Sequence, residues 1–326
     1  MGERVQQKKG ISGSGKAGPG KVMPGSVFEQ AMRAQTTPAP TVSWQWLLTA
    51  GGLAIAGAAV CAWGALCLLF WQGSWQLLYH PVSAVTRTPA SVGLTFDAVG
   101  LETTQAGEPR LKGWWIPAAA GARYERFTVL YLHGQRGNLG DAAEELAALH
   151  ALGLNVLAFD YRGYGQSEFE RPGEARWRED AESALNYLTA TRHVAADSIV
   201  LDGRELGANL ALEIAAAHPE LAGVVVESPL DAPVQAIFND ARARMVPAHM
   251  LVQDRFDSDG AAAALRLPSL WFLQDSAVGQ AGSGGAFRKA AGKKMLVWLK
   301  AGSEKKDFGD SLARWLDDMP AKTGKP

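Results

Sequence analysis

The segment VLDGRELGANLALE at positions 200–213 decides the fold of this chain. Together with Ile199, its first residues form a short apolar run typical of a buried strand, and its last residues form an alanine-rich stretch typical of a helix. Gly203 and Gly207 flank the junction, and glycines at this spacing permit a sharp strand-to-helix turn. We therefore expect Glu205, midway between the two glycines, at the top of that turn.

Short apolar runs alternate with helical stretches on both sides of this segment. We expect eight strands, at 94–99, 111–116, 127–133, 155–160, 198–202, 223–227, 269–273 and 295–299. Helical patterns lie between most of them, notably at 141–151, 176–191, 207–218 and 310–318. Two strands joined directly and then repeated strand–helix units predict an α/β fold, with a mostly parallel eight-stranded sheet and helices on both faces.

The most apolar stretch is WLLTAGGLAIAGAAVCAWGALCLLFW at 46–71, and no charged residue occurs between Arg33 and Arg87. A helix of this length spans a bilayer core of about 30 Å. A buried core helix is a weaker interpretation because such helices seldom run beyond about 20 residues without a polar break. A cleaved signal peptide is also weaker, because over 40 residues precede the apolar region. We predict a single transmembrane helix at 44–73 that anchors the protein.

The segment before this helix is polar and basic, with six Lys and Arg residues against two Glu residues. We expect 1–43 to be a disordered basic tail and 320–326 a flexible C-terminus. Basic residues before the span place the N-terminus in the cytoplasm, the anchor in the inner (cell) membrane and the C-terminal domain outside the cytoplasm. The net charge is −1, and the folded part lacks a basic cluster for nucleic acid. Cys61 and Cys67 both lie in the apolar span, so the rest of the chain has no thiol for a disulfide or a metal.

Several further motifs accompany the central segment: LYHP at 78–81, LKGWWIP at 111–117, YLHGQRGN at 131–138, FDYRGYGQSE at 159–168 and VVVESP at 224–229. In this order the set resembles the membrane-anchored, serine-aminopeptidase-like branch of the α/β-hydrolase superfamily. The resemblance covers 77–319, with a cap segment at about 229–266, and implies the α/β-hydrolase fold. In that fold a Gly-x-Ser-x-Gly turn, the nucleophile elbow, exposes the catalytic serine.

The resemblance assigns the site residues one by one. The backbone N–H groups of Gln135 and Leu206 correspond to the oxyanion hole, and Glu205 stands where the family has its serine. Asp275 corresponds to the catalytic acid. No histidine follows His249, so the base expected after the last strand is missing. The resemblance thus implies a degenerate catalytic triad.

These losses favour a catalytically inactive, membrane-anchored protein that binds a lipid, a small acyl ligand or a protein partner that the sequence does not identify. The alternative is an esterase, lipase or thioesterase with non-standard residues, for example a carboxylate nucleophile or a relocated histidine. A third possibility, a decaying gene product without a selected function, also stays open. We expect no cofactor and no metal, since Glu205, Asp275 and Asp307 lack a histidine or cysteine companion for zinc, although a calcium-like oxygen site stays open.

The sequence also predicts where the Glu205 side chain goes. Oxyanion-hole donors are arranged for a developing negative charge, and a glutamate offers a permanent one. We therefore expect its carboxylate to turn back toward the amides of Gln135 and Leu206 and to close the site. Replacement by Gln should then destabilise the domain.

Overall fold

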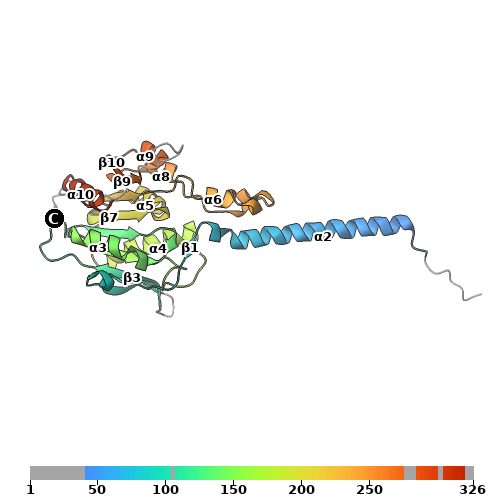
Figure 1. The fold of residues 1–326 in the computed structure, drawn as a ribbon, viewed down its shortest axis with the longest axis horizontal. Helices are drawn as coiled ribbons and strands as arrows, with labels where there is room; N and C mark the ends of the chain where they lie inside the picture. The colour runs from blue at the N-terminus through green and yellow to red at the C-terminus, as the bar shows by residue number, and fades with distance from the viewer. Residues whose placement is uncertain (1–40, 104–106, 275–283, 300–303, 320–326) are drawn as a thin grey trace, which may run out of the picture. The chain divides into compact units, whose positions relative to one another are not determined.

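The computed structural model describes residues 41–103, 107–274, 284–299 and 304–319 (Figure 1). The chain divides into two compact units, residues 1–60 and 61–326. The long helix α2 (Trp44–Gly73) begins in the first unit and ends in the second. It is long and apolar enough to cross a membrane, and its bounds agree with the predicted span.

The second unit contains the predicted eight-stranded sheet. Its strands are β2 (Asp97–Thr103), β3 (Pro109–Ile116), β4 (Thr128–Leu132), β6 (Asn155–Phe159), β7 (Ile199–Arg204), β8 (Gly223–Glu227), β9 (Ser269–Gln274) and β10 (Lys294–Leu299). Their order across the sheet is β10-β9-β8-β7-β4-β6-β3-β2. The pairs β2–β3 and β3–β6 are antiparallel and the others are parallel, so the predicted topology is confirmed.

The sequence placed most strand bounds within one or two residues, and the first strand was the exception. It begins at Asp97 rather than at residue 94 and extends to Thr103. Its partner β3 explains the shift, because Asp97 pairs with Trp115 and Thr103 with Pro109. Register with a neighbouring strand, and not the apolar run alone, therefore sets the ends of an edge strand.

Helices cover both faces of the sheet. The helices after α2 are α3 (Ala143–Ala151), α4 (Glu174–Asn186), α5 (Leu206–Ala217), α6 (Gln235–Phe238), α7 (Ala248–Leu251), α8 (Ser258–Ala264), α9 (Gly285–Lys289) and α10 (Glu304–Asp317). Of these, α3, α4, α5 and α10 pack against the sheet. Short 3-10 turns lie at Ser74–Leu77, Pro89–Val92, Leu139–Ala142, Ala196–Ser198 and Ala241–Arg244, and a π-turn at Tyr187–Thr191 extends α4. The two-residue strands β1 (His80–Pro81) and β5 (Arg136–Gly137) pair with each other beside the main sheet.

Two apolar cores follow from the alternation of side chains along the strands. One core joins α4 and α5 to Leu130, Leu201 and Val224, and the other joins α3 and α10 to neighbouring residues of the same strands, such as Val129 and Val200. The helices on the two faces are visible around the sheet in Figure 1. This layering fixes the carboxyl ends of β4, β7 and β8, where the site residues lie.

Candidate functional site

The turn between β7 and α5 places Glu205 at its apex. Glu205 has φ 51° and ψ −119°, a conformation that residues other than glycine seldom adopt. Its backbone N–H donates a hydrogen bond to the carbonyl of Glu227 at 2.9 Å, which ties the turn to the end of β8. The backbone at this position is therefore strained and held by the sheet.

The two glycines that flank Glu205 are required by close backbone approach. A Cβ at Gly203 would lie 2.3 Å from the carbonyl oxygen of Gly207, and a Cβ at Gly207 would lie 2.2 Å from the carbonyl oxygen of Leu132. Neither contact is tolerable, and neither partner can move, because both are backbone atoms of the sheet and the helix. The Gly-x-Glu-x-Gly spacing is thus a packing requirement of this strand-to-helix turn.

The backbone N–H of Leu206, the first residue of α5, donates to the side-chain amide oxygen of Gln135 at 3.2 Å. Gln135 is itself fixed, since its carbonyl accepts hydrogen bonds from the His80 N–H and the Tyr164 hydroxyl, both at 2.8 Å. Its side chain is nearly buried. The structure therefore brings Gln135 and Leu206 together. The Gln135 side chain, however, accepts the hydrogen bond of the Leu206 N–H, which is one of the two N–H groups expected to bind an oxyanion.

The prediction that the Glu205 carboxylate fills this position is wrong. Within the described residues that carboxylate makes no hydrogen bond and caps no helix. It points past Gly134, where an added Cβ would lie 3.0 Å from its Oε2 atom. The physical reason is that Gln135 already satisfies Leu206 with a neutral amide, so a charged carboxylate gains little by leaving water.

Two cavities adjoin the turn. The first, about 270 Å³, is lined by Glu205 and Gly134 together with residues of the loop that follows β4. The second, about 260 Å³, lies over the ends of β7, β8 and β9 and is walled by α3 and α10. Tyr131, Glu145 and Arg204 border both cavities. Arg204 pairs with Glu145 at 2.5 Å between its Nη1 and the carboxylate Oε1.

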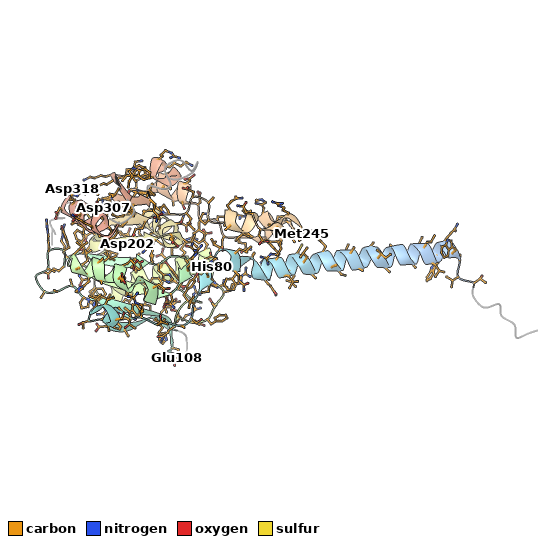
Figure 2. All side chains as sticks on the ribbon, in the orientation of Figure 1. His80, Glu108, Asp202, Met245, Asp307 and Asp318 are labelled. Atoms are coloured by element: carbon orange, nitrogen blue, oxygen red, sulfur yellow. The ribbon has the colours of Figure 1, made fainter. Side chains whose placement is uncertain are left out.

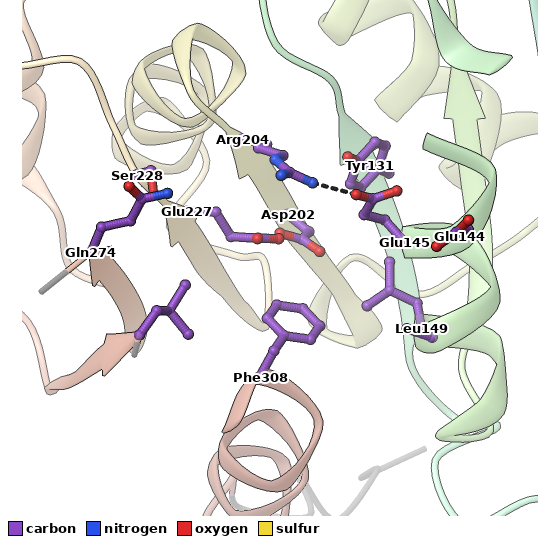
Figure 3. Close-up of a pocket in the computed structure, with 12 residues that line it drawn as sticks. Tyr131, Glu144, Glu145, Leu149, Asp202, Arg204, Glu227, Ser228, Gln274 and Phe308 are labelled. Atoms are coloured by element: carbon purple, nitrogen blue, oxygen red, sulfur yellow. Dashed lines mark hydrogen bonds and ion pairs between the residues drawn. The ribbon is translucent and has the colours of Figure 1, made fainter. Parts of the chain in front are cut away.

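The second cavity contains two acidic residues that sequence reasoning missed, Asp202 and Glu227. They lie on adjacent parallel strands, where Arg204 of β7 is in register with Glu227 of β8. Their carboxyl groups face each other between Arg204 and Phe308 (Figure 3). Asp202 lies inside the folded domain (Figure 2) and is 1% exposed. The sequence did contain a signal for this pair: each acidic residue lies within or at the end of an otherwise apolar strand, in VLDG and in VVVE.

Burial perturbs this acidic pair. Desolvation raises the pKa of Glu227 to about 7, against the opposing effect of the nearby Arg204 guanidinium. Burial and the neighbouring Glu227 carboxyl raise the pKa of Asp202 as well. Neither Asp202 oxygen has a hydrogen-bond donor within the described residues. Two carboxylates are both acceptors, so a hydrogen bond between them requires that they share a proton.

His133, which lines the first cavity together with Glu205, has a structural environment. Its ring packs at 4.6 Å from that of Tyr161 and 5.3 Å from that of Tyr164, and its Nδ1 lies 2.8 Å from the Gly134 carbonyl. Burial lowers its pKa to about 4, so it is neutral near pH 7. These contacts make His133 a structural residue of the loop that follows β4.

The chain has six histidines, all within the described residues, and none forms a hydrogen bond with Glu205. His218 lies between Glu182 and Glu220, and the ring of His249 packs 4.1 Å from that of Phe238. The predicted acid, Asp275, lies outside the described residues. Among the residues that are described, no group of three or more His, Cys, Asp or Glu side chains could hold a metal ion.

Comparison with known proteins agrees with this architecture. Residues 124–256 match the family described as Serine aminopeptidase, S33. The chain is 31% identical over 216 residues to the uncharacterized protein Rv2307c of Mycobacterium tuberculosis, a match that covers 66% of this chain and 74% of that protein. It is also 31% identical over 120 residues to the uncharacterized protein YfhR of Escherichia coli, covering 36% of this chain and 42% of YfhR.

Solved structures show the same fold. An α/β hydrolase from Vibrio vulnificus superposes with a TM-score of 0.55 at 22% identity, covering 70% of this chain and 82% of that one. The Pyrococcus furiosus esterase Pf2001 superposes with a TM-score of 0.58 at 16% identity, covering 74% of this chain and 98% of that one. The sheet order, the glycine-flanked turn and these similarities define an α/β-hydrolase fold. The chain belongs to the α/β-hydrolase superfamily.

Proposed function

We propose that this chain is a membrane-anchored α/β-hydrolase-like protein that binds a small ligand beside its strand-to-helix turn and does not hydrolyse it. The observation that carries the proposal is the residue at the apex: Glu205 occupies the strained position that presents a serine hydroxyl in active relatives of this fold. A carboxylate there has no hydroxyl proton to lose and provides no serine nucleophile.

The surroundings of Glu205 support the same conclusion. Serine-type hydrolysis also needs a base beside the nucleophile and free donors for the oxyanion. The Leu206 N–H is engaged by the Gln135 side chain, and no histidine bonds to Glu205. The two cavities next to the turn nevertheless leave space for a ligand of modest size.

A carboxylate nucleophile is the competing proposal, since a carboxylate can form an ester intermediate with a substrate. Hydrolysis of that ester requires a base that activates water, and the rings of His133, His150, His218 and His249 contact other groups. The inactive, ligand-binding function therefore fits the geometry better.

The membrane anchor is part of the proposal. Helix α2 supplies the apolar length, and the basic excess before it favours a cytoplasmic N-terminus in the inner membrane, with the hydrolase-like domain outside the cytoplasm. The ligand would then be met on the extracytoplasmic side.

A turnover assay tests the proposal. Full-length protein purified in nanodiscs is incubated with p-nitrophenyl esters of short, medium and long acyl chains, beside the Glu205→Ala variant. We expect both proteins to match the rate of empty nanodiscs. Hydrolysis by the wild-type protein that is lost in Glu205→Ala would show that Glu205 is a nucleophile and would overturn the proposal.

A further inference from the structure

The cavity over β7, β8 and β9 has a charge imbalance built into its lining. Its described acidic side chains are Glu144, Glu145, Asp202 and Glu227, and Arg204 is the only basic residue among the twelve described residues of the lining. Arg204 is paired with Glu145, and Glu144 lies 3.4 Å from Arg87 outside the cavity. Among the described residues of the lining, the pair Asp202 and Glu227 has no equal positive charge.

The environment of Asp202 is a second, independent indication that this cavity binds a ligand. Its side chain is almost completely buried, it lines the cavity, and apart from a proton shared with Glu227 neither of its oxygens has a donor within the described residues. Buried acceptors without donors are unusual in folded proteins because desolvation is costly. A donor supplied by a bound ligand would satisfy Asp202 together with Glu227.

The remaining lining indicates what kind of donor fits. Part of the lining is apolar and consists of Ala148, Leu149, Leu299 and Phe308. A metal ion is a poor match, since the described residues provide no set of three ligands and hard cations prefer many oxygens. An ammonium group on a short hydrocarbon presents three N–H donors at one end and an apolar body at the other.

We propose that this cavity binds a small primary alkylamine in its protonated form. The ammonium group contacts Glu227 and Asp202, and the hydrocarbon lies against Leu149 and Phe308. The volume of about 260 Å³ limits the ligand to a compact molecule. This inference rests on the proposed function, because it names the ligand class of a site that binds without hydrolysis.

The acidic pair gives the binding a definite pH dependence. Glu227 is faced by Asp202 and Arg204 of β7, Glu145 of α3 and Tyr131 of β4. Glu227 loses its proton near pH 7, whereas an alkylammonium stays charged to about pH 10. The cation therefore competes with the proton that Glu227 releases, and binding tightens as the pH rises through about 7.

Calorimetry with cyclohexylamine tests this proposal, using full-length protein in nanodiscs and empty nanodiscs as the blank. We expect cyclohexylammonium to bind about tenfold more tightly at pH 8 than at pH 6, with release of protons to the buffer. Cyclohexanol and cyclohexanecarboxylate, which match its shape without its charge, should give no binding heat.

Two variants localise the site. Glu227→Gln keeps the shape of the side chain and should weaken cyclohexylammonium binding by about tenfold or more, the equivalent of 1.4 kcal/mol. Glu220→Gln removes the same charge from a carboxylate that does not line the cavity and should bind like the wild type. Thermal unfolding of both variants verifies that they fold.

The outcomes separate the two proposals. No binding by a folded, hydrolytically silent wild-type protein, or binding that Glu227→Gln leaves unchanged, overturns the amine site and leaves the inactive assignment in place. Equal binding of cyclohexanol also overturns it. Ester hydrolysis that depends on Glu205 overturns the proposed function instead.

Discussion

The side-chain amide oxygen of Gln135 accepts a hydrogen bond from the backbone N–H of Leu206 at 3.2 Å, at the start of α5. The two residues are 71 positions apart and meet only because β4 and β7 are neighbours in the sheet. This contact occupies a donor that a hydrolase of this fold needs for the oxyanion. It thereby links the packing of the sheet to the proposed loss of hydrolysis.

Gln135→Ala removes this contact and leaves the buried Leu206 N–H without its partner. We expect a loss of about 1 kcal/mol in unfolding free energy, the usual value of a neutral hydrogen bond. Urea titration measures it, and Arg136→Ala, at the exposed next position, should change stability by less than about 0.5 kcal/mol. Ester hydrolysis should not appear in either variant. A stability loss no larger than that of Arg136→Ala would argue against the contact.

Glu205→Gly relieves the strained backbone at the apex of the turn. Because φ is 51° there and the carboxylate has no hydrogen bond within the described residues, we expect a gain of about 1 kcal/mol in stability. Glu205→Gln keeps the strain and should stay within about 0.5 kcal/mol of the wild type. A large loss in Glu205→Gln would instead restore the idea of a carboxylate that closes the site.

Glu227→Gln should change the pH dependence of stability. Burial raises the pKa of Glu227 from its ordinary 4.5 to about 7, so the folded state holds a proton that the unfolded chain has lost. The contribution of Glu227 to the unfolding free energy is fully present below about pH 4.5 and is lost as the pH rises through about 7. The advantage of Glu227→Gln over the wild type should therefore grow across that window and then level off.

Glu220 provides a control with the opposite sign. Its hydrogen bond with His218 lowers its pKa, so its contribution is present at neutral pH and is lost in acid. The difference between Glu220→Gln and the wild type should shrink as the pH falls. Chemical denaturation at a series of pH values measures both variants, and parallel curves for the two would contradict the assignment of a buried acidic pair.

Arg162→Met should destabilise the domain strongly. Arg162 is 4% exposed, and its Nε donates to the fully buried Asp180 at 2.6 Å. Removing the guanidinium leaves a buried carboxylate without its counter-charge, which costs about 3–5 kcal/mol. Arg178→Met breaks a more exposed pair with Glu213 and should cost about 1 kcal/mol or less. Equal losses in the two variants would contradict this difference.

Alkaline-phosphatase and fluorescent-protein fusions at the C-terminus test the proposed topology. Basic residues precede the apolar helix Trp44–Gly73, so we expect an active phosphatase fusion and a dark fluorescent fusion. The protein should stay in the membrane fraction after carbonate washing. The reverse fusion pattern would place the domain in the cytoplasm and overturn the orientation.

Much of the fold could be predicted because local patterns agree with the sheet. Apolar runs located the strands, and the spacing of Gly203 and Gly207 located the turn around Glu205. The partner of Leu206 could not be predicted, because it depends on a rotamer of Gln135 in a loop of distant sequence. The pair Asp202 and Glu227 was missed for a similar reason: only the register of two parallel strands brings these carboxyls together.

Covalent labelling with a fluorophosphonate tests the central claim most directly, since the reagent forms a stable adduct with an activated serine in this fold. Intact-mass measurement of the full-length protein should show no adduct, and Glu205→Ser should also remain unlabelled because none of the six described histidines forms a hydrogen bond at the apex. A stoichiometric adduct on the wild-type protein would reveal an activated nucleophile and would contradict the account.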